Sequence, residues 1–165
     1  RRIATGLGRP AEGLDYLEMF ITGVIDAALA AQNGAAAAES LGLGMVYIGG
    51  MRNHPEEVAA LLGLPPGVFA VFGMCVGRPD PARPADIKPR PPQAVVLHHE
   101  RYSLDAQDAG IAAYDRAMTR FYAEQKMNVH GTWSVHSSKR IAGPETLSGR
   151  HRLVEALQAL GFALK

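Results

Sequence analysis

Features that would assign this 165-residue chain to a specialised class are scarce in its sequence. Cys75 is the single cysteine, so no disulfide can form within the chain. The 17 basic and 16 acidic side chains leave a formal net charge of +1, which argues against a broad nucleic-acid surface. A membrane span needs about 18 uncharged apolar residues in a row. Glu18 and Asp26 interrupt the most apolar segment, and we therefore expect no span and no membrane partner.

The composition that is present fits one ordinary globular domain. Hydrophobic residues make up 47% and charged residues 20% of the sequence, which excludes a disordered tail. We expect a single soluble domain over residues 1–165, in the cytoplasm. The chain opens with Arg1 and Arg2 rather than Met and shows no signal segment, so we expect a further segment ahead of it.

Hydrophobic periodicity predicts a mixture of helices and strands. From Leu14 to about Ser40 apolar residues recur at helical spacing on more than one face, which suggests packing against a partner subunit, although a plain core helix is as good an interpretation. Six prolines between Pro79 and Pro92 exclude helix and central strand there. The expected elements are a helix over 14–40, a strand over 45–48, a helix capped by Asn53 and ended by Gly63, a doubly buried strand over 68–76 that contains Cys75, a strand over 95–98, a helix over 108–125 and a final helix over 147–160.

Common cofactor and metal motifs do not fit the sequence. The glycines at 42 and 44 lack the third glycine of a dinucleotide fingerprint and precede a strand instead of following one. His98 and His99 are adjacent in an expected strand, where neighbouring side chains face opposite sides, so they cannot share one metal ion. We therefore expect no metal site, and we expect Cys75 to be a small buried hydrophobe.

Two segments remain that suit a flat, anionic ligand. In the first, Tyr47-Ile48-Gly49-Gly50-Met51-Arg52-Asn53, a strand end followed by two glycines allows close approach of a ligand to exposed main-chain N–H groups. A tight turn that merely needs positive φ is the alternative. In the second, prolines hold Lys88 and Arg90 extended and two residues apart, so that both cations can face one phosphate.

These segments also resemble a known family, the FMN-dependent nitroreductases, and within it the NADPH-using, oxygen-insensitive group that includes bacterial flavin reductases. The resemblance covers roughly residues 14–162 and misses an N-terminal arginine-containing segment of the family pattern. The motifs that carry it are Glu39-Ser40-Leu41-Gly42-Leu43-Gly44, Tyr47 to Asn53, Phe72-Gly73-Met74-Cys75-Val76-Gly77, Asp86-Ile87-Lys88-Pro89-Arg90-Pro91, His99-Glu100, Thr132-Trp133-Ser134 and Gly161-Phe162.

The resemblance implies an α+β fold with a mainly antiparallel sheet flanked by helices, in an intertwined homodimer that holds non-covalent FMN at its interface. It implies an enzyme in which NADPH, or NADH, reduces the flavin and the flavin reduces nitroaromatics, quinones or free flavin, without a catalytic side chain. A flavin-free, non-catalytic dimeric fragment of the family is the alternative. The residues implied to bind FMN are Tyr47, Ile48, Gly49, Gly50, Met51, Lys88 and Arg90, with the N–H of Gly49 or Gly50 donating to flavin N5, and those implied to bind substrate or NADPH are Arg52 and Arg150.

Overall fold

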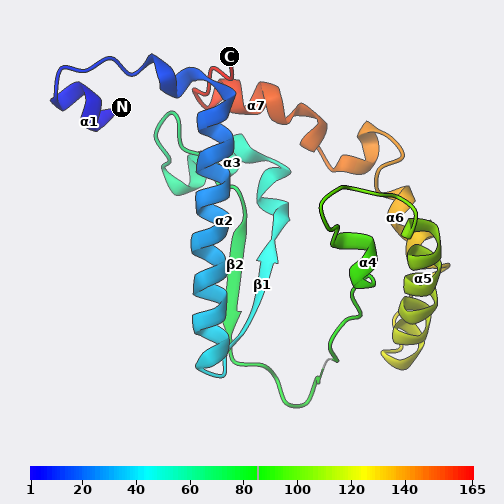
Figure 1. The fold of residues 1–165 in the computed structure, drawn as a ribbon. Coiled ribbons are helices and arrows are strands. Elements are labelled where there is room, and N and C mark those ends of the chain that lie inside the picture. Colours follow the sequence, from blue (N-terminus) through cyan, green and yellow to red (C-terminus); the bar gives the residue numbers. More distant parts are fainter. Residues whose placement is uncertain (85) are drawn as a thin grey trace. The chain divides into compact units, whose positions relative to one another are not determined.

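The computed structural model describes residues 1–84 and 86–165 and divides the chain into two compact units (Figure 1). The first unit comprises Arg1–Pro79 with Ser148–Lys165, and the second comprises Asp80–Leu147. The prediction of a single domain stays a prediction. The helices and strands are α1 (Arg2–Gly6), α2 (Leu17–Ser40), β1 (Gly44–Ile48), α3 (Pro55–Leu62), β2 (Gly73–Gly77), α4 (Gln93–Val96), α5 (Gln107–Glu124), α6 (Trp133–Lys139) and α7 (Leu153–Ala159).

The long helix of the first unit is α2, which lies alongside the two strands (Figure 1). Its alanine-rich second half favours helix, and Gly42 ends it with a left-handed φ of 74°. The N–H groups of Gly42 and Leu43 then bond to the carbonyls of Glu39 and Ala38, at 2.9 and 3.0 Å. The predicted helix over 14–40 is confirmed in type and differs at its start, which lies at Leu17.

The two strands form an antiparallel pair in which Gly44 faces Gly77 and Ile48 faces Gly73. The predicted strand over 68–76 is confirmed over residues 73–76, but its start was wrong: β1 ends at Ile48, which pairs with Gly73, so β2 begins only there. The burial prediction was also wrong for Cys75, which is exposed. Within the described residues the sheet has two strands. The second half of β2, residues 75–77, is exposed, so it is not covered on both faces. The α+β class and the antiparallel sheet are confirmed.

Helices α3 and α7 pack against each other through buried apolar side chains. Ala59 of α3 and Ala156 and Leu157 of α7 are buried. Gly63 ends α3 with a φ of 62°, as predicted, but the residue at the N-cap position is His54, so the expected cap at Asn53 was wrong. The Asn53 side chain is instead engaged elsewhere in the unit, as described below. The final helix also starts later than predicted, because Leu147 belongs to a separate 3-10 turn.

In the second unit, α5 carries the core. Tyr114, Met118 and Tyr122 recur every four residues on its buried face, and Met118 is fully buried, so its replacement by Ala should cost about 2–5 kcal/mol. The predicted helix over 108–125 is confirmed within one residue at each end. The predicted strand over 95–98 was wrong: Pro92 opens the single turn of α4, in which the N–H of Val95 bonds to the Pro92 carbonyl at 2.9 Å.

Outside these elements, the described residues from Pro79 to Pro92 form neither helix nor strand, as their prolines predict. Ala85 lies outside the described residues. No helix in the described part of the chain is long and apolar enough to cross a bilayer.

Candidate functional site

The end of β1 presents free main-chain donors. The chain leaves Ile48 and enters a 3-10 turn over Gly49–Arg52, which the N–H of Asn53 closes on the Gly50 carbonyl at 3.0 Å. The first N–H groups of such a turn have no partner within it. Among the described residues no hydrogen bond is donated by the N–H of Gly49 or Gly50. Both donors are therefore available to a ligand.

The backbone angles at Gly49 and Gly50 distinguish between the two explanations for glycine at these positions, a turn with positive φ and close approach of a ligand. Neither Gly49 nor Gly50 has a φ in the left-handed range, so the alternative of a turn that needs positive φ is wrong. A Cβ on Gly50 would meet no atom within 4 Å, whereas one on Gly49 would lie 3.2 Å from the Arg52 guanidinium. Neither conformation nor packing within the described chain requires glycine at position 50. Its bare backbone faces open space, as close approach of a flat molecule would need.

The residues on either side of the glycines pack onto the strand pair. The Tyr47 ring contacts the Phe72 ring edge to face, with centroids 5.1 Å apart, and Tyr47 is 38% exposed. Met51 lies over Gly73 of β2, where a Cβ would be 3.4 Å from the Met51 Cγ. Ile48 is half-buried. Tyr47, ahead of the glycines, and Met51, behind them, are thus both held against the segment Phe72–Gly73.

The side chain of Arg52, the last residue of the 3-10 turn, connects the turn to a neighbouring segment. Its guanidinium donates from Nη1 to the Val71 carbonyl at 2.5 Å, and its Nη2 lies beside Gly49. Arg52 therefore ties the turn to the segment that precedes β2. This hydrogen bond uses one terminal nitrogen of the Arg52 guanidinium. The binding of substrate or NADPH by Arg52 stays a prediction.

Arg150 joins the same site from a distant part of the chain. Its Nε donates to Oδ1 of Asn53 at 2.7 Å, across 97 residues of sequence. Gly149, with a φ of 87°, makes the approach possible, since a Cβ there would lie 2.8 Å from the main-chain oxygen of Asn53. Sequence reasoning missed the roles of Asn53 and Gly149, and the only signal was the Ser148-Gly149 pair just before Arg150.

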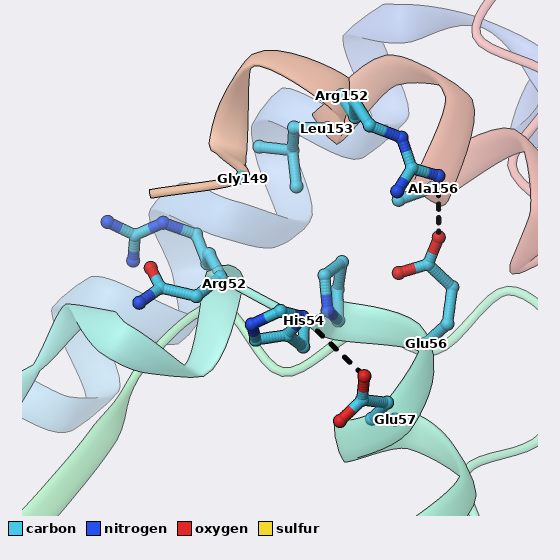
Figure 2. A pocket seen from close by; sticks show the side chains of 10 residues that line it. Arg52, His54, Glu56, Glu57, Gly149, Arg152, Leu153 and Ala156 are labelled. Atoms are coloured by element: carbon cyan, nitrogen blue, oxygen red, sulfur yellow. Dashed lines mark ion pairs between the residues drawn. The ribbon is translucent and has the colours of Figure 1, made fainter. Parts of the chain in front are cut away.

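A small cavity of about 210 Å³ adjoins this turn, and Figure 2 shows its lining. Glu56 points toward Arg152, with 3.7 Å between its Oε1 and Nη2 of the arginine (Figure 2). His54 points toward Glu57, with 3.5 Å between Nδ1 and Oε1. The lining contains two arginines, Arg52 and Arg152, and two glutamates, Glu56 and Glu57, so the cavity offers little unbalanced charge to an ionic ligand. Of the predicted site residues only Arg52 lines it.

Lys88 and Arg90 belong to the second unit. Both side chains are exposed, and in the described part of the chain neither forms an ion pair with a carboxylate. Between them Pro89 is half-buried, and its carbonyl accepts a hydrogen bond from the Tyr114 hydroxyl at 3.1 Å. The structure thus brings the segment Tyr47–Arg52 and Arg150 together in one unit and presents Lys88 and Arg90 as a pair on the other.

Two sequence models of known families match the chain. The nitroreductase family matches residues 17–78, and the nitroreductase family C-terminal domain matches residues 88–165. The first match contains the 3-10 turn and both strands, and the second contains Lys88, Arg90 and Arg150. Together they cover most of the sequence.

Individual relatives agree with the family match. The chain is 40% identical over 151 residues to the NADPH-flavin oxidoreductase of Vibrio harveyi, covering 90% of this chain and 60% of that protein. It is 39% identical over 158 residues to the oxygen-insensitive NADPH nitroreductase of Salmonella typhimurium, covering 94% and 62%. Nitroreductase A from Vibrio parahaemolyticus superposes with a TM-score of 0.83 at 38% identity, covering 100% of this chain and 64% of that one.

The chain therefore spans somewhat less than two thirds of the length of these relatives. Both the sequence and the fold agree with the resemblance drawn from its motifs. The chain belongs to the nitroreductase family.

Proposed function

We propose that this chain supports FMN-dependent transfer of electrons from NADPH, or NADH, to nitroaromatics, quinones or free flavin. The relatives named above are an NADPH-flavin oxidoreductase and an NADPH nitroreductase. The observation that carries the proposal is the 3-10 turn over Gly49–Arg52, which has two free N–H donors and a bare backbone at Gly50. A flat ring system that accepts hydrogen bonds matches such a surface.

The residues present fit the flavin ring of FMN. The N–H of Gly49 or Gly50 would donate to flavin N5, and Tyr47, Ile48 and Met51 would flank the ring. FMN, when bound, supplies the redox chemistry by accepting two electrons from a nicotinamide and passing them on. The protein's part is to orient the ring and to keep the glycine backbone bare, so no side-chain acid, base or nucleophile is required.

The FMN phosphate would be held by Lys88 and Arg90. A lysine point charge and an arginine fork suit a phosphate, and these two cations lack a carboxylate partner among the described residues. The hydrogen bond from Tyr114 to Pro89 holds the backbone between them, so little of it would need to be ordered on binding.

We also propose a homodimer, formed through α2. Four large apolar side chains recur every fourth residue along this helix and are 43–62% exposed, which suits a second helix surface better than water. The stripe consists of Leu17, Ile21, Ile25 and Leu29. We place the activity in the cytoplasm because NADPH, the proposed reductant, is supplied there.

The function is tested by the reductive reaction itself. FMN-loaded protein is mixed with NADPH under anaerobic conditions while the flavin absorbance is followed, and a nitroaromatic or a quinone is then added. We expect the flavin band to bleach with NADPH and to return with the acceptor. A bound flavin that NADPH does not bleach would contradict the proposed function, and would favour a member of the family without this activity.

A further inference from the structure

We propose that Asn53 is a positioning residue for Arg150, and that it aims the free guanidinium N–H groups of Arg150 at the phosphate groups of the pyridine nucleotide. The proposal rests on the proposed function for the presence of that ligand. It assigns to Asn53 a role that neither a helix cap nor contact with the flavin would give it.

The first observation is the geometry of the Asn53 side chain. Its Oδ1 accepts the Nε–H of Arg150 at 2.7 Å, in a partly buried contact, while its main-chain N–H bonds to the Gly50 carbonyl at 3.0 Å. One residue thus connects Arg150 to the turn that carries Gly50. Because Nε is the arginine donor that is used, the two terminal nitrogens of the fork stay free to bind a ligand.

The second observation is that the backbone around Arg150 is fixed independently. Gly149 packs so closely that a Cβ would lie 2.8 Å from the Asn53 carbonyl oxygen. Arg150 then opens a 3-10 turn that runs into α7, whose Ala156 and Leu157 are buried. The backbone therefore has little freedom, and the remaining freedom of Arg150 lies in its side chain, which Asn53 orients.

The third observation comes from comparing three arginines of the same unit. Arg52 donates to the Val71 carbonyl, and Arg152 lies 3.7 Å from Glu56. Arg150 faces no carboxylate in the described part of the chain, and its only hydrogen bond there is to a neutral amide. Neither Arg52 nor Arg150 forms an ion pair among the described residues, but Arg52 already uses a terminal nitrogen for its hydrogen bond, whereas Arg150 uses only Nε. A positioned guanidinium with both terminal nitrogens free is suited to bidentate contact with a phosphate.

The positioning can be measured without turnover. Arginine Nε–H signals are recorded by NMR on the full chain, and the signal lost in Arg150→Lys identifies Arg150. We expect this proton to exchange slowly with water and to exchange about tenfold faster in Asn53→Ala, since a hydrogen bond to a charged group is removed. Equal exchange in the two proteins would overturn the assignment.

The consequence for the ligand is tested by a double-mutant cycle. NADP⁺ is titrated into FMN-loaded protein and binding is followed by the change in flavin absorbance. We expect Asn53→Ala and Arg150→Ala each to raise the Kd by about tenfold and the double variant to bind no worse than Arg150→Ala. Multiplied effects in the double variant would show that Asn53 does not act through Arg150 and would overturn the proposal.

Arg152→Ala is the matched control, because it removes an arginine two residues away that Glu56 already faces, and we expect less than about twofold change in Kd. If Asn53→Ala does not fold, Asn53→Asp replaces it: the Nε–H should stay protected, while the added carboxylate weakens NADP⁺ binding. NADP⁺ binding by Asn53→Asp as tight as by the wild type would count against the proposal. Failure of the wild type to retain FMN would contradict the proposed function alone, since the exchange measurement needs no flavin.

Discussion

The hydroxyl of Tyr114 donates a hydrogen bond to the main-chain carbonyl of Pro89 at 3.1 Å. Burial raises the pKa of this phenol, with a further rise from nearby Tyr122, while Arg90 lowers it. The phenol is therefore neutral near pH 7 and can donate. The bond joins the buried face of α5 to the proline-rich segment between Lys88 and Arg90, and so links the core of the second unit to its proposed phosphate site.

Tyr114→Phe should weaken FMN binding several-fold while riboflavin binding is preserved. The variant removes one hydrogen bond, which contributes about 0.5–1.5 kcal/mol, and frees the backbone between the two cations. Fluorescence titration with each flavin measures the effect. Tyr122→Phe is the control, since Tyr122 is buried in the same cluster and makes no hydrogen bond to Pro89. Equal losses for both flavins would argue against a link to the phosphate site.

Replacing both Lys88 and Arg90 by Ala should weaken FMN binding at least about a hundredfold, because two charge-assisted contacts to phosphate are removed. Riboflavin, which has no phosphate, should bind as before. The control is the double variant Arg83→Ala with Arg101→Ala, which removes the same charge from other exposed positions of the second unit. If the control weakens FMN as much, general charge rather than a phosphate site explains the effect.

Gly50→Val should abolish flavin binding and leave the fold intact. The added side chain meets no protein atom within 4 Å and needs no unusual φ, so it should change the melting temperature little. It would occupy the space proposed for the flavin ring. Gly13→Val is the matched control, since Gly13 also lies in a 3-10 turn and has open space at its Cβ. Normal flavin content in the Gly50→Val protein would refute the role of this glycine.

Acid stability should depend on Asp15. Hydrogen bonds from Lys165, at 3.0 Å, and from Arg1 lower the pKa of its carboxyl below the ordinary 3.8. A lowered pKa stabilises the fold at pH values above 3.8, and this stabilisation is lost as the pH falls through the folded-state value. Asp15→Asn should therefore reduce the drop in melting temperature that the wild type shows as the pH is lowered from neutrality to below 3.8. Asp26→Asn, at an exposed position of α2, should leave the profile unchanged.

Ile25→Asp should convert the proposed dimer to a monomer. Ile25 is 51% exposed at the middle of the apolar stripe on α2, and a buried, unpaired carboxylate at a helix interface is strongly unfavourable. Light scattering coupled to gel filtration gives the mass directly. Asp26→Asn, on a neighbouring face of the same helix, should keep the wild-type mass. A monomeric wild type would contradict the dimer.

The helices were predictable where one face has a regular apolar pattern and a glycine marks the end. In α5 the spacing of Tyr114, Met118 and Tyr122 identified the buried face, and Gly63 marked the end of α3. The segment over 95–98 is also apolar but lies close behind Pro92, and its first two residues belong to the helical turn α4 instead of a strand. The start of β2 depends on where its partner β1 ends, and the apolar pattern over 68–76 does not contain that information.

The candidate site was predictable only as far as it is continuous in sequence. The turn over Gly49–Arg52 could be located from its residues and from the family resemblance. The contact between Asn53 and Arg150 could not, because these residues are 97 positions apart and neither belongs to a motif that implies the other. Whether glycine at 50 serves a turn or an open surface also needed the backbone angles.

The measurement that tests the central claim most directly is the visible absorption spectrum of the chain after mixing with excess FMN and desalting. If the turn over Gly49–Arg52 holds the flavin ring, the protein should stay yellow, with flavin bands shifted from those of free FMN and about one flavin per chain. A folded protein that emerges colourless at micromolar concentration would contradict the assignment of this turn as a flavin site.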